Sequence, residues 1–86
     1  MRLDLYLKTT RIIKRRTVAN EACGAGRVMI NGKPAKPSAE VKPGDRLDVR
    51  FGGKTGAYEV LSIQPHAPKS EAANMYRVIS EPAEGF

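Results

Sequence analysis

The stretch GRVMINGK, residues 26–33, marks the change from a helical to a strand-like pattern in this chain. Val28 and Ile30 alternate as in a strand with one face in the core. Asn31-Gly32 follows at once, and this dipeptide is the strongest short signal for a two-residue hairpin turn. Gly26 is typical of the residue that ends a helix. The stretch therefore predicts a helix end, a strand and a tight hairpin in succession.

Two short helices are predicted before this stretch. Leu3, Tyr6 and Leu7 recur at helical spacing and indicate a helix from Leu3 to about Thr9. Its polar side would carry Asp4 and Lys8, and we expect Asp4 to cap the helix or to interact with its dipole. Residues 9–14 predict a tight connection. A second helix is predicted from Arg15 or Arg16 to Ala25, with small apolar positions at Val18, Ala19, Ala22 and Cys23.

A small sheet is predicted after the hairpin. Residues 33–39 contain two prolines, which favours an edge segment or a loop. Lys42-Pro43-Gly44-Asp45 is typical of a type II turn. Two strands should follow, separated by Gly52-Gly53. Their buried positions would be Leu47, Val49 and Phe51, then Tyr58, Val60 and a further candidate at Ser62, with Leu61 and Ile63 on the other face. The predicted fold class is α+β: two short N-terminal helices packed on a small, mainly antiparallel sheet.

The sequence suggests a domain over residues 1–64 and a tail over residues 65–86. Ala72, Met75, Tyr76 and Ile79 stand at helical spacing, which favours a partly helical tail, although Met75 to Ile79 could instead form a strand. The last residues, 81–86, are expected to fray.

Size and composition bound the function. A chain of 86 residues supports one core and no large enclosed cleft. The single cysteine, Cys23, has no partner for a disulfide or a zinc site and is expected to be a small buried hydrophobe. No apolar run is long enough to span a membrane, so we expect a cytoplasmic protein with no membrane partner. His66, the single histidine, has no nucleophile or acid beside it in a catalytic pattern. We therefore expect no enzyme activity, no cofactor and no metal.

Positive charge is concentrated in the first part of the chain. Residues 1–36 carry nine bases and two acids, a net charge of +7, whereas residues 37–86 carry six bases and seven acids, a net charge of −1. A directed basic patch of this kind favours nucleic acid as the partner. The few aromatic residues argue against a platform for stacking single-stranded bases, so folded or duplex RNA is expected.

The densest basic run is Arg11-x-x-Lys14-Arg15-Arg16, at the start of the predicted second helix. Cations destabilise a helix N-terminus unless an anion binds there, so the run predicts a phosphate contact. Arg2 could pair with Asp4 or join this surface. The complete set of predicted RNA-binding residues is Arg2, Lys8, Arg11, Lys14, Arg15, Arg16, Thr17, Arg27, Lys33 and Lys36.

Several motifs resemble the RNA-binding domain of small-subunit ribosomal protein S-four. They are RLDLYL at residues 2–7, the basic run through Arg16, GRVMINGK at residues 26–33 and VKPGD at residues 41–45. Residues 7–17 and the tail segment EAANMY, residues 71–76, further resemble the RqcP-like family, stand-alone members of this fold. Asn20 departs from the family pattern, since relatives often have a base there.

The resemblance implies a function. RqcP-like proteins act in bacterial ribosome-associated quality control: they bind large ribosomal subunits that retain a peptidyl-tRNA, contact ribosomal RNA and tRNA, and assist an RqcH-like factor that adds a C-terminal alanine tail. Arg2 and Arg16 match RNA-contact positions of the family. The resemblance thus implies a monomeric RNA-binding factor with ribosomal RNA, tRNA and an RqcH-like tailing factor as partners.

Three alternatives stay open. A heat-shock relative of the same fold handles stalled large subunits by another route and usually carries a longer basic C-terminal extension, which is not expected here. The fold also occurs as an accessory RNA-binding module of RNA-modifying enzymes. A protein-interaction module that uses the acidic strand face would instead bind a basic protein at high salt.

Overall fold

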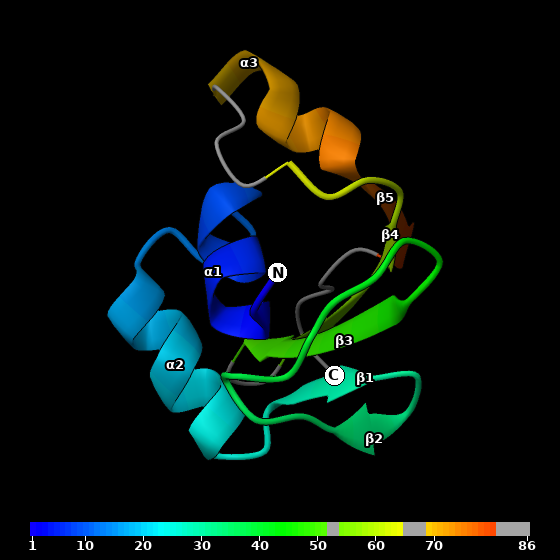
Figure 1. Cartoon of the computed structure of the whole chain (residues 1–86). Coiled ribbons are helices and arrows are strands. Elements are labelled where there is room, and N and C mark those ends of the chain that lie inside the picture. The colour runs from blue at the N-terminus through cyan, green and yellow to red at the C-terminus, as the bar shows by residue number, and fades with distance from the viewer. Residues whose placement is uncertain (52–53, 65–68, 81–86) are drawn as a thin grey trace.

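The computed structural model describes residues 1–51, 54–64 and 69–80. Helices α1 (Leu3–Thr9) and α2 (Arg16–Gly24) lie side by side next to an antiparallel sheet, and the short helix α3 (Lys69–Ala72) lies beyond one end of α1 (Figure 1). The five strands are ordered β2-β1-β3-β4-β5 across the sheet. Their bounds are β1 Val28–Ile30, β2 Lys33–Pro34, β3 Arg46–Phe51, β4 Lys54–Val60 and β5 Tyr76–Ser80. The predicted α+β class is confirmed.

The core forms between α1 and one face of the sheet. Leu3, Tyr6 and Leu7 are fully buried, as their helical spacing predicts. The phenol of Tyr6 donates a hydrogen bond of 2.8 Å to the carbonyl of Met75, so α1 is joined to the segment before β5. The sheet contributes the buried side chains of Val28, Leu47, Val49, Tyr58 and Val60.

The end of α2 and its connection to β1 follow the prediction. Gly26 has a φ of 75°, in the left-handed region that glycine tolerates. Its N–H donates to the carbonyl of Cys23 at 3.0 Å, and the N–H of Arg27 donates to the carbonyl of Ala22 at 2.9 Å. These two hydrogen bonds are those of a Schellman motif, which ends a helix and turns the chain sharply. The chain therefore leaves α2 and enters β1 within a few residues.

The Asn31-Gly32 turn is also confirmed. Both residues have positive φ, 51° and 83°, as a type I′ hairpin turn requires. The Asn31 side chain has a further role, because its oxygen accepts the N–H of Arg46 at 3.0 Å and its nitrogen donates to Asp45 at 3.1 Å. The β1–β2 hairpin is thereby attached to the start of β3.

The chain after Val60 differs from the prediction. β4 ends at Val60, so Ser62 is not a strand position and Leu61 and Ile63 do not line the other face of a strand. The N–H groups of Leu61 and Ser62 instead both donate to the carbonyl of Met75, at 2.8 and 3.2 Å. The predicted Gly52-Gly53 turn, His66 and the last residues, 81–86, lie outside the described residues.

The tail is helical only in its first part. Residues 69–75 form α3 and a 3₁₀ turn, Ala73–Met75, which confirms a partly helical tail. The helical prediction is wrong for Tyr76 and Ile79, because β5 pairs there with the free edge of β4. The Tyr76 ring packs edge-on against Tyr58, 5.5 Å between centroids, a cross-strand contact that favours the strand. The described part of the tail thus belongs to the same fold as the preceding residues.

Candidate nucleic-acid interface

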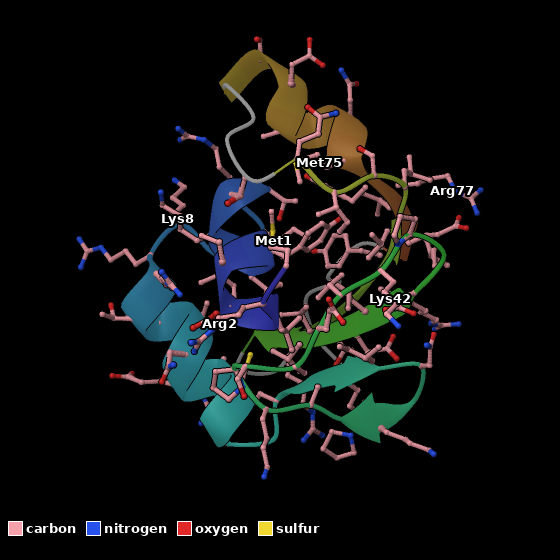
Figure 2. The ribbon with its side chains drawn as sticks, viewed as in Figure 1. Met1, Arg2, Lys8, Lys42, Met75 and Arg77 are labelled. Atoms are coloured by element: carbon pink, nitrogen blue, oxygen red, sulfur yellow. The ribbon has the colours of Figure 1, made fainter. Side chains whose placement is uncertain are left out.

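The predicted RNA-binding residues are all exposed in the structure. Arg2 and Lys8 lie on the side of the molecule formed by α1 and α2, whereas Lys42 and Arg77 lie on the side formed by the sheet (Figure 2). The helical side contains most of the predicted set: Arg2, Lys8, Arg11, Lys14, Arg15, Arg16 and Thr17.

A buried carboxylate organises part of this surface. The side chain of Asp4 is 2% exposed, and Arg2 donates to both of its oxygens, at 3.2 and 3.3 Å. Nε of Arg16 lies 3.5 Å from Oδ2, and the Asn20 amide donates to the same oxygen at 3.4 Å. The N–H of Leu5 donates to Oδ1 at 2.8 Å. One carboxylate thus holds two guanidinium groups, one from the N-cap residue of α1 and one from the first turn of α2.

These contacts keep Asp4 ionised. Burial by itself raises the pKa of this carboxyl, but the hydrogen bonds from Asn20, Arg2 and the Leu5 N–H, together with the charge of Arg16, outweigh it and lower the pKa below its ordinary value of 3.8. At neutral pH the group is therefore a fixed negative charge beneath two cations.

The structure corrects the expected exposure of Asp4, leaves it in the first turn of α1 where it can interact with the helix dipole, and answers the question of Arg2. Asp4 is buried rather than on a solvent-facing side of α1, and α1 has no side-chain cap because Arg2 occupies the N-cap position. Arg2 pairs with Asp4, yet about half of its side chain stays exposed, as does that of Arg16. Both guanidinium groups can therefore contact Asp4 and an external anion together.

A depression of about 430 Å³ lies at this cluster. We call it the Asp4 site, and its lining residues are Arg2, Asp4, Arg16, Thr17, Asn20 and Glu21. The predicted RNA-binding set included Arg2, Arg16 and Thr17, but Asn20 was noted only as a departure from the family pattern. The structure gives Asn20 a positioning role, since its amide holds the carboxylate that holds both arginines.

Helix α2 begins without the groups that usually neutralise a helix N-terminus. Its N-cap is Arg15, with no side-chain cap hydrogen bond, and its first turn has no acidic residue. The unpaired N–H groups of the first turn and the basic side chains of Arg15 and Arg16 carry positive charge at the same place. The arrangement fits an anion such as phosphate, as the basic run predicts.

A second hollow, of about 770 Å³, lies along α2. It brings together Lys14, Arg15 and Arg27 from the predicted set with Arg50 from β3, which sequence reasoning missed because Arg50 belongs to the nearly neutral second part of the chain. Among the described residues, those that line it are Ile12, Ile13, Lys14, Arg15, Val18, Glu21, Ala22, Ala25, Arg27 and Arg50.

Four predicted residues line neither hollow: Lys8, Arg11, Lys33 and Lys36. Lys33 is on the short edge strand β2. Lys36 precedes Pro37, whose carbonyl accepts the N–H of Asp4 at 3.1 Å, so its backbone runs close to the start of α1. Arg11 has a φ of 63° in the turn between α1 and α2.

The single cysteine is not part of a reactive site. Cys23 is buried, and burial together with the nearby charge of Asp4 raises the pKa of its thiol to about 11. The thiol stays protonated at neutral pH, as a small core side chain should.

Comparison with known proteins identifies the family of this chain. Residues 1–47 match the family model described as S4 domain. The chain is 52% identical to the RQC P-site tRNA stabilizing factor of Bacillus subtilis, over 94% of each chain, and 49% identical to that of Streptococcus pneumoniae, over 94% of this chain and 92% of the relative. Among solved structures, heat shock protein 15 of Vibrio cholerae superposes with a TM-score of 0.82 at 32% identity, over 91% of this chain and 80% of that one.

Within the described residues no helix has the length and apolar character needed to cross a membrane. The matches cover both the helices that form the Asp4 site and most of the sheet that supports them. The chain therefore belongs to the S4 domain family and, within it, to the family of RQC P-site tRNA stabilizing factors.

Proposed function

We propose that this protein is a non-enzymatic, monomeric RNA-binding factor of ribosome-associated quality control in the cytoplasm. In this proposal it binds large ribosomal subunits that retain a peptidyl-tRNA, contacts ribosomal RNA and tRNA, and supports C-terminal alanine tailing by an RqcH-like factor. The observation that carries the RNA-binding part is the pair of half-exposed guanidinium groups, Arg2 and Arg16, held by the buried carboxylate of Asp4.

This arrangement suits a phosphate ligand. Arginine in solution must lose side-chain freedom when it binds, but Arg2 and Arg16 already have an orientation fixed by Asp4. Arg2 and Arg16 line the same depression as Thr17, in the first turn of α2, and the net charge of the two arginines and Asp4 is positive. Guanidinium groups bind phosphate oxygens with charge-assisted hydrogen bonds, so RNA backbone is the natural partner.

The quality-control part rests on the relatives. The Bacillus subtilis and Streptococcus pneumoniae proteins are named as stabilizing factors for P-site tRNA. This chain matches nearly the whole length of both proteins, which supports a shared function. The remaining RNA-binding residues of the proposal are Lys8, Arg11, Lys14, Arg15, Thr17, Arg27, Lys33 and Lys36.

Two other functions are compatible with the fold. The similarity to heat shock protein 15 supports a large-subunit recycling factor as the runner-up, and an accessory module for an RNA-modifying enzyme is a further candidate. The higher identity to the tRNA stabilizing factors favours the first proposal.

Co-sedimentation from cell lysate tests the proposal. Tagged protein should travel with large subunits, and Arg16→Ala should release it into the soluble fractions. Arg77→Ala is the matched control: it removes one exposed arginine from the sheet side, where it pairs with Glu59. If the protein travels with small subunits, or if both variants behave alike, the assignment is wrong.

A further inference from the structure

The hollow along α2 differs in character from the Asp4 site. Its middle is aliphatic: Val18, Ala22 and Ala25 follow one another along α2, and Ile12 and Ile13 come from the preceding turn. Val18 is 47% exposed, whereas Ala19 and Cys23 of the same helix are buried in the core. A single exposed valine is ordinary, but one that lies within a hollow of about 770 Å³ forms part of a usable apolar surface. We call this hollow the α2 groove.

The two ends of the α2 groove are cationic. Lys14 and Arg15 lie at the N-terminal end of α2, and Arg27 and Arg50 lie at its C-terminal end. Nine helical residues separate these ends by about 14 Å, at a rise of about 1.5 Å per residue. The N–H of Arg50 donates to the carbonyl of Arg27 at 2.9 Å, so the second pair is held together by the backbone.

Positive charge exceeds negative charge in the described part of the α2 groove. Among the described lining residues Glu21 is the single acid against four bases. Within the part of the chain that the structure describes, none of these four bases forms an ion pair or a side-chain hydrogen bond. Arg2, Arg46 and Arg77, by contrast, each pair with an acid. Free cations beside an apolar floor fit a ligand with an apolar middle and anionic ends.

We infer that the α2 groove binds a short unpaired segment of RNA, such as a bulged nucleotide, with its base on Val18 and its flanking phosphates on the two pairs of cations. An unstacked base can lie against apolar side chains and guanidinium planes, which the floor and rim of the groove supply. This inference rests on the proposed RNA binding and adds to it: the protein recognises an extruded nucleotide in addition to the backbone of folded RNA.

The two hollows meet on α2. Glu21 lines both of them, so the exposed ridge of α2 separates the Asp4 site from the α2 groove. A duplex phosphate at the Asp4 site and an unpaired nucleotide in the α2 groove would therefore lie on either side of one helix. An RNA stem interrupted by a bulge offers both features close together.

Two RNA hairpins with the same stem, one with a single unpaired uridine, test this inference by fluorescence anisotropy. The wild-type protein should prefer the bulged hairpin by about tenfold, in the range that one stacked base contributes. Val18→Ala should remove most of that preference and leave affinity for the plain hairpin unchanged, whereas Arg50→Gln should weaken binding to the bulged hairpin more than binding to the plain one. Alanine favours helix over valine, so Val18→Ala should stay folded.

Matched controls come from the sheet. Val78→Ala removes the same methyl groups from a similarly exposed valine, 42% exposed, on β5, and Arg46→Gln removes an outward-facing arginine from β3, the strand of Arg50. Both should retain the full preference for the bulged hairpin. Equal affinity of the wild type for the two hairpins, or equal effects of Val18→Ala and Val78→Ala, would overturn the inference.

The proposed function has a separate readout in the same assay. If Arg16→Ala abolishes binding to both hairpins while the bulge has no effect, the Asp4 site stands and the α2 groove falls. If the wild type binds neither hairpin, both fall. An NMR titration distinguishes RNA from an acidic amphipathic peptide as the ligand of the α2 groove. The bulged hairpin should shift the methyl signals of Val18. Shifts caused by the peptide and not by the bulged hairpin would make the groove a protein-binding site and contradict the inference.

Discussion

Oδ2 of Asp4 lies 3.5 Å from Nε of Arg16, across the contact between α1 and α2. The carboxylate is buried and the guanidinium is half exposed, so the pair contributes to two properties at once. It joins the two helices, and it fixes the direction in which Arg16 faces solvent.

The Asp4→Asn variant should show whether RNA affinity depends on the arginine orientation that Asp4 fixes or on the net charge of the protein. The variant should lose about 1–2 kcal/mol of unfolding free energy, because the hydrogen bonds to charged partners weaken while the half-exposed arginines remain solvated. Its RNA affinity should fall although its net charge rises by one. Asp48→Asn is the matched control, since it raises the charge equally on the sheet side, where Asp48 pairs with Arg46. Urea unfolding and RNA titration of both variants check this; tighter binding by Asp4→Asn would mean that net charge alone governs affinity.

The same carboxylate predicts a pH dependence. The folded-state pKa of Asp4 lies below its ordinary value of 3.8, so the folded protein holds this group ionised more strongly than the unfolded chain does. Its contribution to stability is therefore fully present above about pH 4 to 5 and is lost as the pH falls through the folded-state pKa. The difference in unfolding free energy between wild type and Asp4→Asn should be constant from pH 7 to pH 5 and shrink below pH 4. A difference that grows on acidification would contradict the direction of the shift.

Binding to RNA should weaken steeply with salt. Each phosphate neutralised contributes about −0.7 to −0.9 to the log–log slope, so three to six contacts give a slope of several units. Arg16→Ala should make the slope shallower by about one and leave helical circular dichroism unchanged, because loss of its half-exposed ion pair with Asp4 costs about 1 kcal/mol or less and leaves the protein folded. Arg15→Ala should behave similarly. Binding that does not change with salt would remove the electrostatic basis of the interface.

Two glycines at the end of α2 should respond in opposite directions to alanine. Gly24 is the last residue of the helix, and a Cβ added there would meet no atom within 4 Å beyond its own stretch of backbone, so Gly24→Ala should stabilise the fold by about 0.5–1 kcal/mol. Gly26 has equal space around it but a φ of 75°, so Gly26→Ala should destabilise by about 1 kcal/mol. Thermal unfolding of the two variants compares them directly. Equal effects would mean that backbone conformation does not control this helix end.

Local patterns predicted most of the fold because they depend on neighbouring residues. The apolar spacing of Leu3, Tyr6 and Leu7 and the positive φ that Asn31-Gly32 accepts are properties of short segments. The strand at Tyr76 was kept only as the alternative to a helix for the opposite reason: its conformation depends on the free edge of β4 and on contact with Tyr58, which are distant in sequence.

The residues of the candidate site likewise divide into those that local sequence predicts and those that depend on tertiary packing. The basic run at the start of α2 could be found from residue type and position alone. The roles of Asp4 and Asn20 could not, because they arise only where α2 packs against α1. Arg50 was likewise hidden, since only the pairing of β3 with β1 brings it beside Arg27.

We propose that this protein recognises a large subunit that carries a trapped peptidyl-tRNA. Simultaneous contact with ribosomal RNA and tRNA would raise the effective concentration of the second contact, and phosphate contacts do not read sequence, so the geometry of the two RNAs must provide the selectivity. Sedimentation with purified large subunits, with and without peptidyl-tRNA, measures this directly. We predict higher occupancy of the subunits that carry peptidyl-tRNA, whatever the tRNA sequence; equal occupancy of the two would contradict the quality-control assignment.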